Sequence, residues 1–320
     1  MRLPFLQTPS DLAVFDTTLD EAAELLRTEP AGAAELAVAG LQHRLDPERG
    51  MLFDYGDVVN AALRQGGGAT VPELAQRLLM RFAAGDPDGW HTPITWSVAA
   101  RPLPGRRAPL RFAVPDPAAD GVEYLVRDGL DPAATGYRAD GYQIVARITG
   151  APHRVQDPRI GAEFDTVLAA LTDGDVVYQA IGERLRGDPA RAWRLGVADC
   201  VVAGAVLAER LNALGYEARL RRGYFLGPIG NDHAWCEVWE EGAWRPLDPV
   251  FAHLATAYRS RHHDAFREAC RGGRLNRLLP CAVPENAPLI LTPDGTPAPP
   301  WAFGGIASRA TEPARVTENA

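Results

Sequence analysis

Residues 199–247 constrain the fold more than any other stretch of the sequence. Asp199 can cap a helix from Cys200 to Leu214, in which apolar residues recur at helical spacing before a stop at Gly215. Three β-prone runs follow the helix, at Tyr216–Phe225, Asp232–Trp239 and Ala243–Leu247. A tight turn joins the last two runs, so they are expected to pair as antiparallel strands. The segment therefore predicts a helix packed on an antiparallel sheet, which is an α+β fold.

The chain before this segment is expected to be helical at first and then β-rich. Thr18 and Glu21 form a capping box, which marks a helix start. Pro72 stands in the first turn of another predicted helix, Val71–Ala84, so we expect the first 85 residues to be helical. Pro and Gly then punctuate residues 86–150, which is typical of short strands. Strands are expected at Val122–Val126 and Tyr142–Ile148, and further helices at Ala31–Arg44, Phe164–Leu171, Val176–Leu185 and Val250–Cys270.

Length and texture indicate how the chain is divided. At about 150 residues per domain, 320 residues correspond to about two domains. We expect an N-terminal helical and then β-rich region over residues 1–155, a domain built on the predicted helix and sheet over residues 156–280, and a Pro-rich extension over residues 281–320. The polar end of that extension, from Ala310, is expected to be mobile.

The charged residues exclude several classes of function. The sequence contains no lysine, and all 33 of its basic residues are arginine. A P-loop, a PLP or Schiff-base lysine, and the lysines of kinases and Ser-x-x-Lys hydrolases are therefore excluded. With 41 acidic residues the formal net charge is −8, and no block of like charge stands out. Nucleic acid and anionic membrane surfaces are not expected as partners.

Targeting and cysteine usage favour a cytoplasmic protein. Residues 1–16 lack the unbroken apolar run of a signal peptide, and the longest clean apolar run, Cys200–Ala208, is far shorter than the roughly 20 residues that span a bilayer. The cysteines lie far apart without a C-x-x-C pair, which disfavours a zinc ribbon or a disulfide scaffold. They are Cys200, Cys236, Cys270 and Cys281.

Three residues in this order form a candidate catalytic set. Cys200 opens the predicted helix, His233 lies on a strand, and Asp248 stands at a strand end, as a thiol nucleophile, its base and the group that orients the base would. The helix N-terminus stabilises a thiolate at Cys200, and an imidazolium at His233 would stabilise it further. The like charge of Asp199 opposes this, unless its carboxylate is committed to capping backbone N–H groups.

Four stretches in order resemble the transglutaminase-like branch of the papain-like cysteine enzymes. They are Ala198-Asp199-Cys200, Leu214–Arg219 continuing to Arg222-Gly223-Tyr224, Asp232–Trp239, and Trp244–Pro249. The spacing is 33 residues from Cys200 to His233 and 15 from His233 to Asp248. The resemblance implies a papain-like core, with Cys200 as nucleophile, His233 as base and Asp248 as the orienting carboxylate. No cofactor and no metal are expected, because the nucleophile is a thiolate and no cluster of metal ligands is visible in the sequence.

The sequence departs from the family pattern upstream of the cysteine. Many relatives have Gly one or two places before the Cys, whereas Gly196 stands four places before Cys200. Family members also place a polar or indole N–H upstream to complete the oxyanion hole, for which both Trp193 and Gln179 remain open. A metal site at His262, His263 and Asp264 is disfavoured, because adjacent helical residues diverge and no third ligand has metal spacing.

The resemblance implies acyl transfer through a thioester acyl-enzyme. Its outcomes include transglutamination, amide formation from a thioester donor in small-molecule biosynthesis, and hydrolysis of a peptide or amide. Without an export signal, the chain is less like the secreted bacterial peptidases of the family than like an intracellular acyltransferase, with an acyl donor and an amine acceptor as partners. A cysteine hydrolase with the same triad and a non-catalytic binding module remain alternatives. The first 150 residues are expected to shape the acyl cleft or to dock a carrier protein.

Overall fold

A computed structural model describes residues 3–65, 67–102, 109–128, 130–131, 133–139, 141–227, 231–298 and 305–309. The helices are α1 (Leu19–Leu26), α2 (Pro30–Val38), α3 (Tyr55–Leu63), α4 (Val71–Met80), the 3-10 helix η1 (Pro87–Trp90), α5 (Pro158–Thr172), α6 (Glu183–Arg186), α7 (Pro189–Arg194), α8 (Cys200–Ala213), α9 (Pro249–Ala257) and α10 (His263–Ala269). The strands are β1 (Phe15–Thr18), β2 (His43–Asp46), β3 (Gly50–Asp54), β4 (Ile94–Ala100), β5 (Arg111–Ala113), β6 (Val122–Asp128), β7 (Tyr137–Ala139), β8 (Tyr142–Ile148), β9 (Val177–Tyr178), β10 (Val197–Ala198), β11 (Ala218–Phe225), β12 (Asn231–Glu240), β13 (Ala243–Leu247), β14 (Leu278–Pro280), β15 (Ile290–Leu291) and β16 (Gly305–Arg309).

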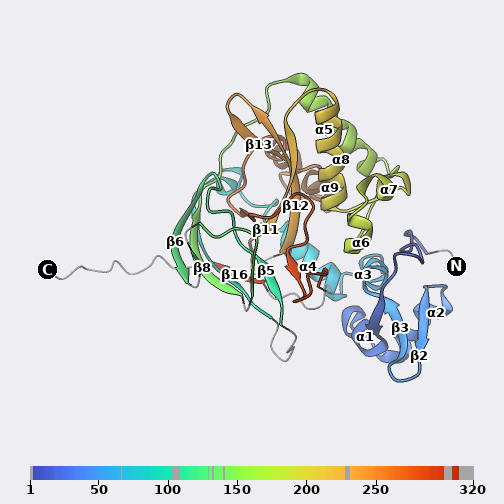
Figure 1. Ribbon diagram of the computed structural model, residues 1–320. Coiled ribbons are helices and arrows are strands. Elements are labelled where there is room, and N and C mark those ends of the chain that lie inside the picture. Colours follow the sequence, from blue (N-terminus) through green and yellow to red (C-terminus); the bar gives the residue numbers. More distant parts are fainter. Residues whose placement is uncertain are drawn as a thin grey trace.

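A four-stranded antiparallel sheet with α8 against it forms the centre of the C-terminal half. The strand order is β13-β12-β11-β14, and Cys236 on β12 lies opposite Leu220 on one side and Leu247 on the other. In Figure 1, α5, α8 and α9 lie together beside this sheet. The predicted α+β core, with a helix on an antiparallel sheet, is confirmed.

The first nine residues of α8, Cys200–Ala208, are buried or half-buried because all of them are small or apolar. Asp199 caps the helix and accepts a hydrogen bond from the Val202 N–H at 3.0 Å. Gly204 permits close contact with the sheet, because a Cβ there would lie 2.8 Å from Leu220 Cδ1 and 3.2 Å from the Trp235 carbonyl carbon. The helix that begins at Cys200 therefore packs closely on the sheet, with Gly204 facing β11 and β12.

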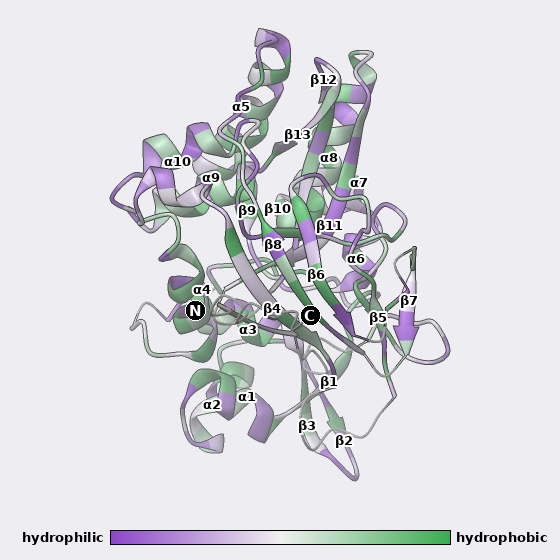
Figure 2. Ribbon diagram, turned by 90° about the vertical axis from the view of Figure 1, so that its left-hand side faces the viewer, coloured by the Kyte–Doolittle hydropathy of each residue, from purple (hydrophilic) through white to green (hydrophobic). Residues whose placement is uncertain are grey.

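Residues 94–148 form two further sheets that include strands from the end of the chain. One has the order β16-β4-β8-β6 and the other β15-β5-β7. Buried and more exposed residues alternate along β8, and Figure 2 shows β4, β6 and β8 side by side. The strands predicted at Val122–Val126 and Tyr142–Ile148 are confirmed as β6 and β8.

The N-terminal residues form a three-stranded sheet as well as helices. The strand order is β1-β3-β2, and α1 packs against α2 and α3 (Figure 1). The capping box of Thr18 and Glu21 is confirmed, and the helix that starts at Val71 ends at Met80. The expectation that the first 85 residues are helical is wrong. The helix expected at Ala31–Arg44 ends at Val38, because Gly40 takes a φ of 94° and the chain then pairs with β3 as β2.

Two other helix predictions need correction. Val176–Leu185 contains the short strand β9, which pairs in parallel with β10, and only its end enters α6. Val250–Cys270 is divided into α9 and α10, with Arg259 between them at a left-handed φ of 49°. The tail from Ala310 lies outside the described residues. The boundaries at residues 155 and 280 stay a prediction, although β15 and β16, which follow the second boundary, pair with β5 and β4 of the N-terminal region.

Candidate active site

Cys200, His233 and Asp248 meet where three elements come together. Cys200 is the first residue of α8, His233 lies near the start of β12, and Asp248 follows β13 and caps α9. The Cys200 side chain is hydrogen-bonded to His233. The imidazole Nε2 lies 2.6 Å from Asp248 Oδ2. The three residues singled out from the sequence therefore form one continuous chain of hydrogen bonds.

Asp248 and Phe251 together hold the imidazole of His233 in place. Its Oδ1 accepts the Phe251 backbone N–H at 2.9 Å, which holds the carboxylate at the start of α9 while Oδ2 faces His233. The Phe251 ring stacks on the imidazole, with ring centroids 4.0 Å apart and planes inclined by 10°. Because Nε2 is committed to Asp248, Nδ1 is the ring nitrogen left to face Cys200.

The surroundings of His233 favour its charged form. Burial alone would lower its pKa, but the charge and hydrogen bond of Asp248, together with the contact to Cys200, raise the pKa to about 10. The exposed fractions are 9% for Cys200, 4% for His233 and 3% for Asp248. At neutral pH His233 is therefore an imidazolium beside Cys200, and the surrounding protein excludes most of the water.

Asp199 does not stand as a free charge beside the nucleophile. Its Oδ1 caps α8, and its Oδ2 pairs with Nε of Arg186 at 2.5 Å. The opposition expected between the Asp199 carboxylate and a thiolate at Cys200 is therefore offset by a cation and by backbone N–H donors.

The two oxyanion candidates lie in different surroundings. Gln179 is buried, and its backbone N–H donates at 3.0 Å to the carbonyl of Ala198, two residues before Cys200. Its Nε2 donates to the Leu6 carbonyl at 2.8 Å, and its Oε1 accepts the Leu6 N–H at 3.3 Å. Trp193 lies on α7 and packs, partly buried, against the core. Position therefore favours Gln179, although both remain predictions.

The N-terminal region holds the loop that carries Gln179. Asn60 on α3 pairs with both backbone groups of Ala180, at 2.9 Å to its carbonyl and 2.7 Å from its N–H. Arg64, which follows α3, donates to the Tyr178 carbonyl at 3.1 Å. Sequence reasoning did not identify Asn60, Arg64 or Leu6, because these contacts join residues more than 100 positions apart.

The other cysteines lie in different surroundings from Cys200, although the Cys270 carbonyl accepts the Asp248 backbone N–H at 2.9 Å. Cys236, Cys270 and Cys281 are buried and unbridged, and burial raises the pKa of each thiol well above the usual value. Cys236 lies opposite Leu220, on the face of β12 that packs against α8.

A metal site is not apparent in the described part of the chain. His263 Nδ1 lies 3.3 Å from Asp264 Oδ1. Among the described residues, no group of three or more His, Cys, Asp and Glu side chains is arranged to hold a metal ion. None of the described helices is long and apolar enough to cross a bilayer.

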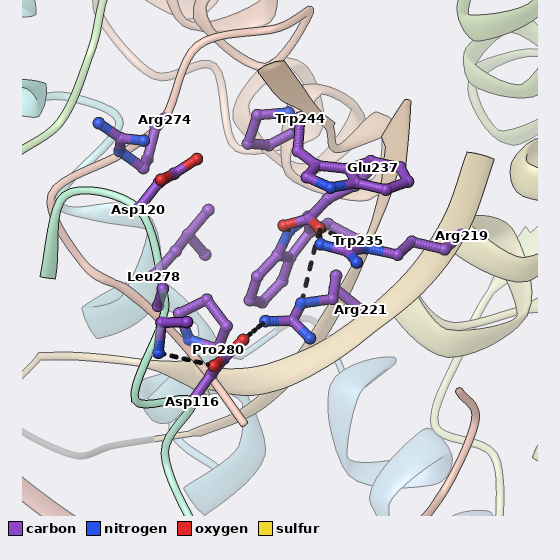
Figure 3. A pocket seen from close by; sticks show the side chains of 13 residues that line it. Asp116, Asp120, Arg219, Arg221, Trp235, Glu237, Trp244, Arg274, Leu278 and Pro280 are labelled. Atoms are coloured by element: carbon purple, nitrogen blue, oxygen red, sulfur yellow. Dashed lines mark hydrogen bonds and ion pairs between the residues drawn. The ribbon is translucent and has the colours of Figure 1, made fainter. Parts of the chain in front are cut away.

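A small pocket of about 70 Å³ lies beyond Trp235 (Figure 3). The Trp235 ring lines this pocket and stacks towards His233, with ring centroids 6.0 Å apart. Glu237 accepts the Trp235 indole N–H at 3.2 Å and pairs with Arg219 at 2.7 Å. The charged residues that line it are balanced: Arg219, Arg221, Arg274, Asp116, Asp120 and Glu237. Cys200, His233 and Asp248 are not among the described residues that line this pocket.

A match to a known protein family covers the residues of this site. The family model of the transglutaminase-like superfamily matches residues 167–249. One similar solved structure, a candidate cysteine protease from Cytophaga hutchinsonii, is 10% identical, with a TM-score of 0.30 over 69% of this chain and 89% of that one. Another, a TGase, is 15% identical, with a TM-score of 0.22 over 41% of this chain and 45% of that one. No curated protein sequence matches the chain significantly. Residues 167–249, which include Cys200, His233 and Asp248, are a core of the transglutaminase-like superfamily, whose members are generally cysteine enzymes.

Proposed function

We propose that the protein is a cysteine acyltransferase that forms an amide from an acyl donor and an amine. The observation that carries the proposal is the hydrogen-bonded chain from Cys200 through His233 to Asp248, which opens at a helix N-terminus. Cys200 is the nucleophile, His233 the proton carrier and Asp248 the group that orients the imidazole. A thiol paired with an imidazole in this way is suited to attack on a carbonyl carbon.

The reaction would proceed in two balanced steps. The Cys200 thiolate attacks the carbonyl of a thioester or amide donor, the imidazolium of His233 protonates the leaving thiol or amine, and a thioester on Cys200 results. An amine then attacks this thioester and gives its proton to the imidazole, and the product amide leaves. Asp248 stays ionised and stabilises the imidazolium that recurs in each step.

Oxyanion stabilisation can come from groups that flank the thiol. The backbone N–H of Cys200 is free of the first intrahelical bonds, as at any helix start. Gln179 uses one N–H of its amide on Leu6 and retains a second one. We assign these two donors to the tetrahedral oxygen, because preorganised donors at that position stabilise the transition state by several kcal/mol.

Transfer is favoured over hydrolysis because water has little access to the site. The side chains of Cys200 and His233 are almost fully buried. Because water is present at about 55 M, an amine reacts with the acyl-enzyme faster than water only if the protein binds and orients the amine. Such positioning provides effective molarities of about 10⁵ to 10⁸ M. Hydrolysis of a peptide or amide by the same triad is the second candidate. We further propose a cytoplasmic setting and a carrier protein as a source of the acyl group.

The partition of the acyl group tests this proposal. A thioester donor is incubated with the protein, with and without a series of primary amines, and the ratio of amide to free acid is measured by mass spectrometry. We expect a mass increase on Cys200 without amine, and amide in preference to acid with a matching amine. The acceptor must be supplied, because the chain has no lysine.

Two outcomes would decide against transfer. If every amine leaves the product as free acid, while peptides are cleaved in a Cys200-dependent way, the protein is a hydrolase. If Cys200→Ala takes up the acyl group as fast as the native chain, the proposed nucleophile is wrong. The Cys281→Ala variant is the matched control, since Cys281 lies in a separate part of the core.

A further inference from the structure

We propose that Arg186 is a positioning residue that sets Cys200 against His233. The inference rests on the proposed function, in which these two side chains react together. Its basis is that one guanidinium binds the residue before Cys200 and the residue before His233. Nε of Arg186 lies 2.5 Å from Asp199 Oδ2, and Nη1 lies 3.1 Å from Asp232 Oδ2.

Arg186 is itself held in place by two further short contacts. Nη1 of Arg186 lies 2.7 Å from Glu183 Oε1, one turn earlier on α6. The Arg186 carbonyl also accepts a hydrogen bond from Asn286 at 2.9 Å. A planar guanidinium that binds several carboxylates keeps them at fixed separations, which a point charge such as lysine does not. The start of α8 and the start of β12 are therefore linked directly, in addition to their packing through the sheet.

A second arginine completes the network without reaching Asp199. Arg222 on β11 pairs with Glu183 at 2.8 Å and with Asp232 at 2.5 Å. Its side chain is fully buried, and that of Arg186 is 19% exposed. Both arginines thus hold Glu183 and Asp232, but only Arg186 bridges to the cap of α8. Arg222 is therefore the natural comparison for the role of Arg186.

The network also controls the charge near Cys200. The charged and titratable groups that face Cys200 are His233 from β12, Asp199 at the cap of α8, Tyr178 from β9 and Arg186 from α6. Burial would lower the pKa of Arg186, but Asp199, Glu183 and Asp232 raise it well above the usual value, so its charge is permanent. Without that cation, Asp199 would be a buried carboxylate with only its cap contacts, next to the thiol.

Four variants test the positioning role of Arg186: Arg186→Gln, Arg186→Lys, Arg222→Gln, and the double variant of Arg186→Gln with Asp199→Asn. Alkylation of Cys200 by iodoacetamide is followed by mass spectrometry from pH 5 to 9, and kcat and KM are measured with a thioester donor. For Arg186→Gln we expect alkylation at pH 7 to slow about tenfold and its half-maximal pH to rise by about one unit, because an unpaired like charge disfavours the thiolate. We expect kcat to fall while KM changes little, since substrate contacts are untouched.

The comparison variants separate charge from geometry. Arg186→Lys keeps a cation near Asp199 but cannot span both carboxylates, so the pH profile should return towards that of the native chain while kcat stays low. Arg222→Gln removes a more deeply buried cation from the same network, and it should leave the alkylation profile where it was. The double variant Arg186→Gln with Asp199→Asn should restore the profile, because Asn still caps the helix and carries no charge.

Each outcome has a definite reading. Equal shifts in Arg186→Gln and Arg222→Gln, or no shift in either, would overturn the positioning role. If Arg186→Gln does not fold, as thermal unfolding would show, the decision passes to Arg186→Lys, whose kcat must fall with an unchanged melting temperature. A native Cys200 that iodoacetamide does not modify would instead overturn the proposed function.

Discussion

Replacing Cys200 with alanine is expected to abolish turnover, with a loss on the order of 10⁶-fold, the size seen when a nucleophile is removed from a triad. The thiol is the group that forms the covalent intermediate, and Cys200 is the cysteine whose side chain acts on His233. Steady-state assays with a thioester donor and an amine measure the effect. The thermal unfolding of the variant should stay close to that of the native chain, because the change removes one small side chain.

Cys281→Ala is the control for this variant. Cys281 is buried in the core of the β-rich region, and its removal should lower stability slightly while kcat stays near the native value. Turnover by Cys200→Ala at more than a small fraction of the native rate would mean that another group attacks the substrate.

Asp248→Asn is expected to lower kcat by about 10³- to 10⁴-fold, because an amide at this position favours the wrong imidazole tautomer and no longer stabilises the imidazolium. Asparagine caps helices as well as aspartate does, so α9 should begin at the same residue. NMR titration of His233 should show its pKa falling from about 10 in the native chain towards lower values, since the largest opposing influence is burial.

The pH dependence of stability has a definite sign. The pKa of His233 is raised from 6.5 to about 10 on folding, so its contribution to the free energy of unfolding is complete below pH 6.5 and is lost as the pH rises through 10. Chemical denaturation of Asp248→Asn should therefore differ most from the native chain at pH 6.5 or below. A native tautomer and a nearly unchanged kcat in Asp248→Asn would show that the carboxylate does not orient the base.

Elements of the core whose own residues carry clear sequence signals were predicted well. The strand predicted at Ala243–Leu247 is β13 with the same ends, and the helix predicted from Cys200 to Leu214 is α8, which ends one residue earlier. Both carry their own signals, which are a tight turn, a capping carboxylate and a terminal Gly.

Elements held by distant partners were not predicted. All residues of β2 (His43–Asp46) are exposed or half-buried, so no apolar alternation marks it, and only pairing with β3 makes it a strand. Strand β9 has two residues, and its partner β10 lies 20 positions further along the chain. Propensity favoured helices in both places, and tertiary pairing overrode it.

The proximity of Cys200, His233 and Asp248 follows from the order of their motifs, and their catalytic roles stay a prediction. The Arg186 network could not be foreseen in this way, because its acids and arginines come from four separate elements and no fixed spacing relates them. The clamp of Leu6 on Gln179 likewise joins residues 173 positions apart.

Mapping which thiol reacts first at neutral pH tests the central claim most directly. The folded native chain is treated with limiting iodoacetamide at pH 7, quenched, digested and analysed by mass spectrometry. Cys200 should be labelled first, because it combines a helix N-terminus with His233 and Asp248, whereas burial raises the pKa of the other three thiols. Faster labelling of Cys236, Cys270 or Cys281, with Cys200 protected, would contradict the assignment of Cys200 as nucleophile.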